Sequence, residues 1–409
     1  MSAAESAKIV IIGGGAVGCG VAYQLALAGK RDIPLLEKES SVAAATSSQA
    51  AGLVGQVRST VERIKLAQWS VATFSQMQQD PDANPSWRQV GSLRVALCEQ
   101  RVAAFKKLAA VAAEADLEVE FIDPARAKGL WPALDFSAAQ AILYCPSDGY
   151  LQPYDLTMAY VKHCRGMGVR FETSRAATGL MLSGNRVTGV ETAEGTIECE
   201  TVINAAGAHA YHVARWAGME LPIVPVRHEF LITVQCEGMD PQLPVVRIPD
   251  GSIYLRPEVG GLLLGGWEPD SLSTDPRKYT SQQEPPRLEA DYDALAFFVE
   301  QMQPQFAPIE QLGIRSVFKG WPTFTPDGRF IVGPSQQVEG FVMAGGCNAH
   351  GVSGSAGIGR HVVESMCETT PAAYVRSLSP DRFSEHAWDW ESAAASARRI
   401  YETYYGIGD

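Results

Sequence analysis

The chain has 409 residues, of which 46% are apolar and 20% charged, a composition typical of a globular protein of two or three domains and unlike collagenous, coiled-coil or disordered chains. Its 34 Lys and Arg residues against 46 Asp and Glu residues give a net charge of −12. Because no basic run could neutralise a phosphate backbone, nucleic acid is excluded as an expected partner.

Eight cysteines are scattered along the chain without a Cys-x-x-Cys pair, which predicts reduced thiols rather than a disulfide framework or a zinc ribbon. The apolar stretch from Ile9 to Ala28 contains five glycines and lacks a basic segment, so it is interpreted as part of the fold and not as a signal peptide. No other apolar run approaches the roughly 18 residues that cross a bilayer. We therefore expect no membrane span and a cytoplasmic location.

The first elements form a β-α-β pattern. The continuously apolar run Lys8–Ile12 is typical of a buried parallel strand. A helix is predicted from Val17 to Leu27, ended by Gly29, and a second strand from Ile33 to Glu37.

The glycines between strand and helix give this pattern its chemical meaning. Gly13 permits the tight turn, Gly15 allows a pyrophosphate to approach the backbone, and Gly18 lets helix and strand pack closely. Glu37, at the end of the second strand, is placed to accept hydrogen bonds from ribose hydroxyls. The complete order predicts a dinucleotide site rather than a glycine-rich structural turn.

The next segment favours FAD over a nicotinamide cofactor. Residues 44–53 are small or hydroxyl-bearing, where a nicotinamide enzyme would continue with a third β-α unit. Two later segments, 200–207 and 340–346, again read as strands ending in small residues. We expect the chain to return twice to one extended cofactor.

Several separate motifs now carry a family resemblance across nearly all of residues 7–370. They are the N-terminal fingerprint, Gly91-Ser-Leu, Asn204-Ala-Ala-Gly207, Val224-Pro-Val-Arg-His-Glu-Phe230, Phe324-Thr-Pro-Asp-Gly328 and Gly345-Gly-Cys-Asn-Ala-His-Gly-Val-Ser-Gly-Ser-Ala-Gly-Ile-Gly359. The sequence resembles the FAD-dependent amine and amino-acid oxidoreductases related to D-amino-acid oxidase, and within them the dimethylglycine and sarcosine dehydrogenase branch.

The resemblance implies a mixed α/β fold in which a Rossmann-like FAD-binding domain (residues 1–85, 146–225 and 319–370) is interleaved with an antiparallel-sheet substrate domain (86–145 and 226–318). Residues 371–409 are expected to form a C-terminal tail. Strands are predicted at Leu93–Leu97, Gly195–Ile203, Val224–Val234, Ser252–Arg256, Gly261–Gly265 and Ile314–Phe318, and a helix from about Ser355 to Glu368.

The cofactor residues expected from the fingerprint and the resemblance lie in six segments of the chain. They are Gly13, Gly15, Ala16, Val17, Gly18, Glu37, Lys38, Thr46, Ser47, Gln49, Ala51, Gly52, Leu53, Ala177, Ala206, Gly207, His350, Gly351, Val352 and Ser353. Backbone N–H groups at the start of the last helix are expected to stabilise the negative charge of a reduced flavin near N1 and O2.

Candidate catalytic residues come from the expected substrate domain. The resemblance points to His228 and Tyr254, and strand alternation puts Arg256 on the same face as Tyr254, where it could pair with a substrate carboxylate. Hydride loss next to nitrogen requires a neutral amine, so a histidine with a pKa near neutrality could take the ammonium proton or hold the substrate while water does. The alternative is a strand histidine and a core aromatic without a catalytic role.

Departures from the family narrow these expectations. Gln49 stands where many relatives carry the histidine that links FAD covalently, so non-covalent FAD is expected. Residues 320–327 hold no arginine, which counts against a D-amino-acid oxidase, and Gly261–Gly265 holds no lysine for oxygen activation. The chain ends at Asp409, so the folate-binding half of longer relatives is expected to be absent.

The expected reaction is oxidation of a small secondary or tertiary amine, in particular N-demethylation of an N-methyl amino acid such as dimethylglycine or sarcosine. Hydride would pass to flavin N5, and the iminium product would hydrolyse. O₂ or an electron-transfer protein would accept the electrons. The alternatives are oxidation of proline, hydroxyproline or a free D-amino acid, and a non-catalytic FAD-binding subunit. No metal is expected: His209 and His212 have i, i+3 spacing, but no carboxylate or cysteine accompanies them.

Overall fold

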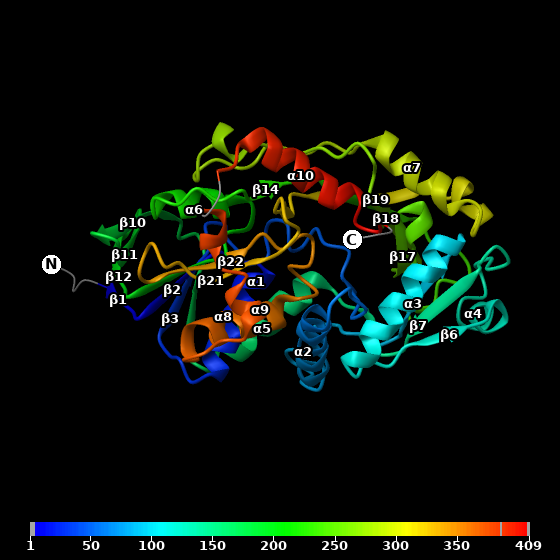
Figure 1. Ribbon diagram of the computed structural model, residues 1–409, viewed down its shortest axis with the longest axis horizontal. Coiled ribbons are helices and arrows are strands. Elements are labelled where there is room, and N and C mark those ends of the chain that lie inside the picture. Colours follow the sequence, from blue (N-terminus) through cyan, green and yellow to red (C-terminus); the bar gives the residue numbers. More distant parts are fainter. Residues whose placement is uncertain (1–4, 385–386, 407–409) are drawn as a thin grey trace.

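The computed structural model describes residues 5–384 and 387–406 and contains two large sheets beside each other (Figure 1). One is mainly parallel and the other mainly antiparallel, and strands of both alternate along the chain. The mixed α/β fold class expected from the sequence is confirmed. Within the described residues, every helix is too short or too polar to pass through a lipid bilayer.

The parallel sheet has six strands in the order β21-β22-β13-β2-β3-β9, and only β21 is antiparallel to its neighbour. Their bounds are Ile331–Pro334, Phe341–Gly345, Thr201–Asn204, Ile9–Ile12, Ile33–Leu36 and Val169–Glu172 in that order. Most of these strands read as uninterrupted apolar runs because both faces of the sheet are covered.

One face of this sheet packs against helices α1 (Ala16–Leu27), α5 (Pro153–Arg165) and α8 (Ser355–Cys367) (Figure 1). Helices α1 and α8 approach closely at two glycines: a Cβ atom at Gly20 would lie 2.7 Å from the Ser355 carbonyl oxygen, and one at Gly359 would lie 2.6 Å from the Gly20 carbonyl oxygen. This contact ties the end of the β22 loop to the N-terminal fingerprint.

The opposite face packs against α6 (Ala210–Trp216) and a second sheet of order β1-β12-β11-β10. The strands of that sheet are Glu5–Ser6, Gly195–Glu198, Arg186–Thr192 and Ala177–Ser183. The prediction of one strand over Gly195–Ile203 is therefore wrong: β12 and β13 are separate strands in two different sheets.

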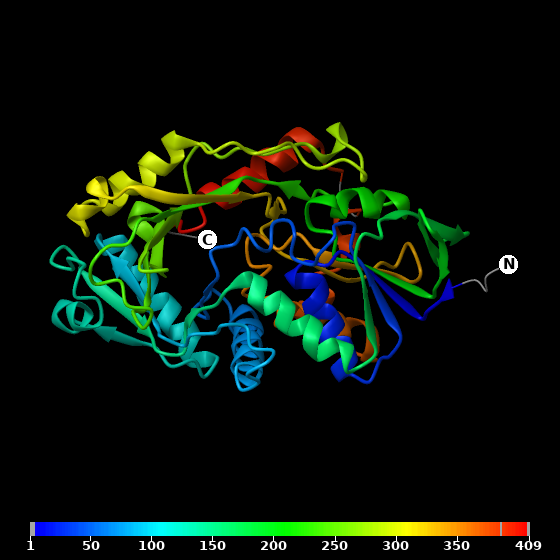
Figure 2. The same ribbon diagram turned by 180° about the vertical axis from the view of Figure 1, so that it is seen from behind.

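The second large sheet forms a roof over the carboxyl ends of the parallel strands, and Figure 2 shows the two regions from behind. Its order is β19-β15-β18-β17-β16-β5-β7-β6, with bounds Ile314–Gly320, His228–Thr233, Gly261–Gly266, Ile253–Glu258, Val245–Ile248, Ser92–Ala96, Ala141–Cys145 and Glu120–Ile122. The pair β5–β16 is parallel, so the expectation of a purely antiparallel roof needs correction. The predicted strand Val224–Val234 is also interrupted, because β14 (Val224–Pro225) pairs with β20 (Thr323–Phe324) outside the roof.

One face of the roof is apolar and carries α7 (Tyr292–Met302) and α4 (Pro124–Leu130). Side chains such as Leu93, Val246 and Leu255 point into this core. Because side chains alternate along a strand, their neighbours in sequence point to the opposite face, toward the parallel sheet.

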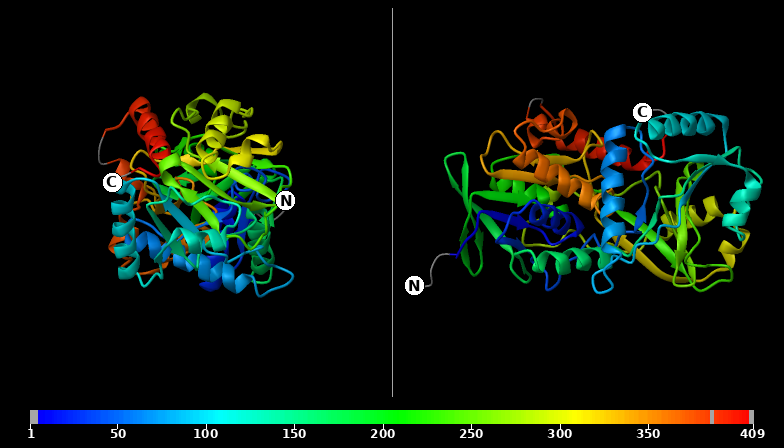
Figure 3. Two further views of the ribbon diagram at one scale, coloured as in Figure 1. Left: turned by 90° about the vertical axis from the view of Figure 1, so that its right-hand side faces the viewer. Right: turned by 90° about the horizontal axis from the view of Figure 1, so that it is seen from below.

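The C-terminal segment crosses back over the molecule to the junction of the two sheets (Figure 1). Helix α9 spans Ala373–Arg376, and α10 (Trp390–Glu402) packs against β14 and β20 through a cluster that contains Trp390, Ala397 and Tyr401. What the sequence suggested to be a tail is thus a helix with a buried face. The remaining elements are β4 (Leu53–Val54), α2 (Val61–Met77), α3 (Glu99–Glu114) and β8 (Gly149–Tyr150). Figure 3 shows α2 and α3 between and beside the two regions.

Candidate functional site

A cavity of about 1750 Å³ lies between the carboxyl ends of the parallel strands and the polar face of the roof. The predicted cofactor residues line it except Ala16 and Gly18, which lie in the first turn of α1, and the predicted catalytic residues His228 and Tyr254 line it too. The structure therefore brings the separate cofactor segments of the sequence to one cavity.

The glycine turn at the end of β2 has the geometry that a dinucleotide requires. Gly13 has a φ of +111°, and a Cβ atom there would lie 2.5 Å from the Ala205 carbonyl oxygen. A Cβ atom at Gly18 would collide with the Gly13 carbonyl oxygen. Both glycines are required by backbone packing, as the fingerprint predicts.

Two polar side chains accept hydrogen bonds from the backbone around this turn. The Glu37 carboxylate accepts hydrogen bonds from the backbone N–H of Gly14 (2.8 Å) and Glu39 (2.9 Å), while burial raises its pKa. The Ser47 hydroxyl accepts from Ala16 N–H at 2.9 Å.

Lys38 and Gln49 lie farther along the same wall. The Lys38 ammonium group contacts His209 Nε2 at 3.1 Å and forms an ion pair with Glu284. Gln49 lies below the end of β19, where a Cβ atom at Gly320 would be 3.2 Å from the Gln49 Cβ atom. His209 is thus engaged with a lysine.

The loop between β22 and α8 forms the third part of the wall. Asn348 and Ala349 have φ values of +45° and +59°, an uncommon pair for residues other than glycine. Asn348 Nδ2 donates to the Gly346 carbonyl at 2.8 Å, and Thr325 N–H donates to Asn348 Oδ1 at 3.0 Å. Gly351 and Val352 line the cavity, and their consecutive N–H groups form no hydrogen bond to a described backbone acceptor, which suits the carbonyl edge of a flavin.

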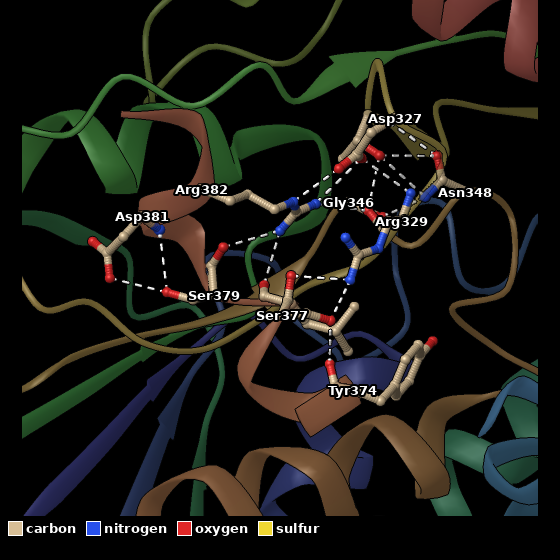
Figure 4. Close-up of polar contacts among 11 residues, drawn as sticks. Asp327, Arg329, Gly346, Asn348, Tyr374, Ser377, Ser379, Asp381 and Arg382 are labelled. Carbon is tan, nitrogen blue, oxygen red and sulfur yellow. Dashed lines mark hydrogen bonds and ion pairs between the residues drawn. The ribbon is translucent and has the colours of Figure 1, made fainter. Parts of the chain in front are cut away.

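A polar network beside the cavity supports this loop, and Figure 4 shows its contacts. Arg382 donates to Asp327 at 2.8 Å and to the Arg329 carbonyl at 3.2 Å, and Arg329 donates to the Ser377 carbonyl at 3.0 Å. The segment after α8 thus fixes the turn that is bonded to Asn348.

A continuous chain of hydrogen bonds enters the cavity from the roof. Tyr254 Oη lies 2.7 Å from His228 Nε2, and His228 Nδ1 lies 3.1 Å from Tyr401 Oη, which in turn donates to Glu268. Burial raises the pKa of Glu268, and Arg227, which donates to the other Glu268 oxygen at 3.0 Å, opposes this rise by favouring the ionised carboxylate.

The order of donors fixes the histidine tautomer. Because the Tyr401 proton goes to Glu268, Tyr401 Oη can only accept from His228, so Nδ1 carries the ring proton. Nε2 is then an acceptor for Tyr254 O–H. The roof thus presents an oriented, neutral imidazole to the cavity.

The expectation of a near-neutral His228 pKa is wrong. Burial and the neighbouring Arg227 lower the pKa of His228 to about 3. A ring this weakly basic is suited to orient and accept a hydrogen bond rather than to hold the ammonium proton. The role of His228 toward a substrate stays a prediction.

Aromatic rings surround this histidine. Trp267 stacks on the His228 ring at 4.6 Å and on Tyr404 at 3.8 Å, and all three rings line the cavity. Tyr404 Oη also lies 2.8 Å from His350 Nε2, and this contact joins the segment after α10 to the loop between β22 and α8. These stacking contacts hold the three rings in place as part of the cavity wall.

Arg256 is not placed as the sequence suggested. Its guanidinium donates to the carbonyls of Ala51 (2.8 Å) and Pro257 (3.0 Å), forms an ion pair with Glu258, and stacks over Tyr150. It does not line the cavity. Arg256 therefore fastens the roof to the cofactor segment instead of meeting a substrate carboxylate.

Sequence reasoning missed Glu268, Trp267, Tyr401 and Tyr404. Trp267 and Glu268 directly follow β18, so their place at the end of a roof strand could have pointed to them. Tyr401 and Tyr404 lie in and after α10, which reaches the site only through its tertiary packing. No local pattern near His228 announces them.

Comparison with known proteins shows the family to which this chain belongs. A family model described as FAD dependent oxidoreductase (DAO) matches residues 8–365. The chain belongs to this FAD-dependent oxidoreductase family. The branch expected from the sequence motifs is confirmed by its relatives.

Two curated members of the family show the relation. The chain is 31% identical over 390 residues to 4-methylaminobutanoate oxidase (formaldehyde-forming) of Paenarthrobacter nicotinovorans, and 30% identical over 408 residues to mitochondrial dimethylglycine dehydrogenase of Rattus norvegicus. These alignments include 93% and 98% of this chain but only 46% and 47% of the relatives. The chain thus spans about half the length of these relatives.

A solved structure has the same fold. The structure of L-proline dehydrogenase from P. horikoshii superposes with a TM-score of 0.84 over 94% of this chain and 99% of that protein, at 24% identity. The glycine turn, the partly buried Glu37 and the N–H groups of Gly351 and Val352 in the β22–α8 loop fit FAD, the cofactor of the family.

Proposed function

We propose that this chain catalyses FAD-dependent oxidation of a small secondary or tertiary amine, by N-demethylation of an N-methyl amino acid. The observation that carries the proposal is the bond chain Tyr254–His228–Tyr401–Glu268 at the cavity wall opposite the dinucleotide turn. The names of both curated relatives, a formaldehyde-forming methylaminobutanoate oxidase and a dimethylglycine dehydrogenase, support this substrate class.

FAD, when bound, supplies a two-electron acceptor for the hydride of the C–H bond next to nitrogen. The chain's own residues prepare the amine. Trp267 and Tyr404 line the cavity beside its alkyl groups, and the Tyr254 hydroxyl, held by His228 at 2.7 Å, provides a fixed hydrogen-bonding group. The product iminium then takes up water and separates into formaldehyde and the demethylated amine.

Water is proposed as the acceptor of the ammonium proton, because the His228 pKa of about 3 leaves the ring too weak a base. We further propose non-covalent FAD, since the side chain of Gln49 provides no nucleophile for a linkage. O₂ or an electron-transfer protein would reoxidise the cofactor.

The test is an anaerobic titration of the purified yellow protein with N-methylated amino acids, proline and free D-amino acids. The proposal expects loss of the oxidised flavin band near about 450 nm with an N-methyl substrate, together with one formaldehyde per flavin reduced. Reduction by proline with a cyclic imine product would favour the ring-amine alternative. A flavin that no amine reduces would favour a non-catalytic FAD-binding subunit.

A further inference from the structure

Three arginines meet on the cavity wall beside Tyr254. Arg247 is the direct partner of Tyr254 between β16 and β17, and Arg94 is the direct partner of Arg247 between β5 and β16. Residues paired in this way project from the same face of a sheet. The side chains of Tyr254, Arg247 and Arg94 therefore form a row on the cavity side of the roof. Arg58, from the loop after β4, lines the cavity with them.

These guanidinium groups are buried and lack a full set of partners. Arg94 and Arg247 are only 8% and 6% exposed. Arg94 Nη2 and Arg58 Nη1 donate to the same carbonyl oxygen, that of Val57, at 3.0 and 2.9 Å. Within the described residues, Arg94 Nε and Arg247 Nη1 have no hydrogen-bond partner.

The charges of this arginine cluster (Arg58, Arg94 and Arg247) are not balanced by the described protein groups. None of the three forms an ion pair with any residue from 5–384 or 387–406 within 4.0 Å. Asp148 is the nearby carboxylate, and it is already bonded to Gln56 N–H at 2.8 Å and to the Ser92 hydroxyl at 2.6 Å. Three positive groups against one negative group leave a net charge of about +2.

The lowered pKa of Arg94 agrees with positive charge that no described protein anion balances. Burial, together with the neighbouring Arg247 and Arg58, lowers the pKa of Arg94 to about 10. Gathering like charges in a buried wall costs free energy that a bound anion would recover. Guanidinium groups suit carboxylates in particular, because they bind both oxygens at once.

We propose that Arg58, Arg94 and Arg247 bind the carboxylates of an acidic substrate, so that the amine oxidised here is an N-substituted amino dicarboxylate. Adjacent strands are about 4.8 Å apart, which puts Arg247 and Arg94 about 5 and 10 Å from Tyr254 along the row. When the second carboxylate of a substrate lies two or three carbons beyond its α-carbon, its two carboxylates are separated by about the spacing of Arg247 and Arg94, about 5 Å. The inference rests on the proposed amine oxidation, but the anion site can be tested without turnover.

The first experiment measures binding of glutarate and butyrate to the FAD-loaded protein by calorimetry. Butyrate is glutarate without one of its two carboxylates. Glutarate is expected to bind at least about tenfold more tightly, and Arg94→Gln or Arg247→Gln to weaken it by about 10- to 100-fold. Arg186→Gln, an exposed arginine paired with Glu339, is the matched control and should leave binding unchanged. Equal affinities for the two ligands, or unchanged affinity in both variants, would overturn the site.

The second experiment compares anaerobic flavin reduction by N-methylglutamate and N-methylnorvaline, which lacks the second carboxylate. The wild-type chain should saturate at about 10- to 100-fold lower concentration of the dicarboxylate, and Arg94→Gln should remove that difference with little change in the limiting rate. Arg94→Lys keeps the charge and serves if Arg94→Gln fails to fold.

The two experiments separate the possible failures. If N-methyl amines reduce the flavin but the dicarboxylate has no advantage, the inference is wrong and the proposed function stands. If glutarate binds through the arginines but no amine reduces the flavin, the proposed function is wrong and the anion site remains.

Discussion

Replacing Tyr401 by phenylalanine tests how the roof holds His228. The change removes one hydroxyl that accepts from His228 Nδ1 at 3.1 Å and donates to Glu268. Tyr401 is fully buried, so water has no access to the two groups left behind. Each unsatisfied group costs about 1–3 kcal/mol, and we expect the free energy of unfolding to fall by about 2–4 kcal/mol.

The same change should slow the reaction. Without its Nδ1 acceptor, the His228 ring is free to adopt the other tautomer and present Nε2–H to Tyr254. We expect the limiting rate of flavin reduction to fall by about 10- to 100-fold, less than the 10²–10⁴-fold typical of losing an acid–base group outright. FAD should remain bound, because Tyr401 does not line the cavity.

The assay is single-turnover flavin reduction under anaerobic conditions, with urea unfolding measured on the same samples. Tyr405→Phe is the matched control, because the structure shows only its backbone carbonyl as a hydrogen-bond acceptor, from Arg101. Rates and stability equal to wild type in Tyr401→Phe would refute the hydrogen-bond chain. Equal losses in both variants would show a packing effect without specificity for Tyr401.

Three further outcomes follow from the site. Gly18→Val should give protein without FAD, since a side chain there collides with the Gly13 carbonyl; a yellow, soluble variant would contradict the close packing of the turn. Acid precipitation should release FAD into the supernatant because Gln49 stands at the linking position, whereas a yellow pellet would show a covalent bond. The free energy of unfolding should fall as pH drops from about 6.5 toward 4. In the folded chain the pKa values of His228 and His209 are lowered to about 3 and about 4, so both rings stay neutral in this range, whereas in the unfolded chain they take up protons. Urea midpoints measured across this range should fall more in wild type than in His228→Gln, and parallel curves would remove His228 as a cause.

The N-terminal half of the site could be predicted because its chemistry is local. Gly13, Gly18 and Glu37 lie within one β-α-β unit, where the spacing of residues determines the turn. His228 and Tyr254 needed the family resemblance to be singled out, and the structure brings them to 2.7 Å from each other.

Strand alternation predicts which face of the sheet a side chain lies on, but not which groups it contacts there. It put Arg256 on the side of Tyr254, yet Glu258 and the Ala51 carbonyl engage the guanidinium. The parallel pairing of β5 with β16, which brings Arg94 beside Arg247, joins segments about 150 residues apart and has no local signal.

The C-terminal helix was beyond sequence reasoning for a similar reason. The apolar stripe of α10 shows that one face is buried, but not against what. Only its packing on β14 and β20 brings Tyr401 to His228 and Tyr404 to His350.

The most direct test of the central claim is anaerobic addition of an N-methyl amino acid to the FAD-loaded chain, with flavin absorbance and formaldehyde followed together. The account predicts complete loss of the oxidised flavin band and one formaldehyde for each flavin reduced. A flavin that stays oxidised in the presence of every N-methyl, cyclic and free amino acid would contradict it.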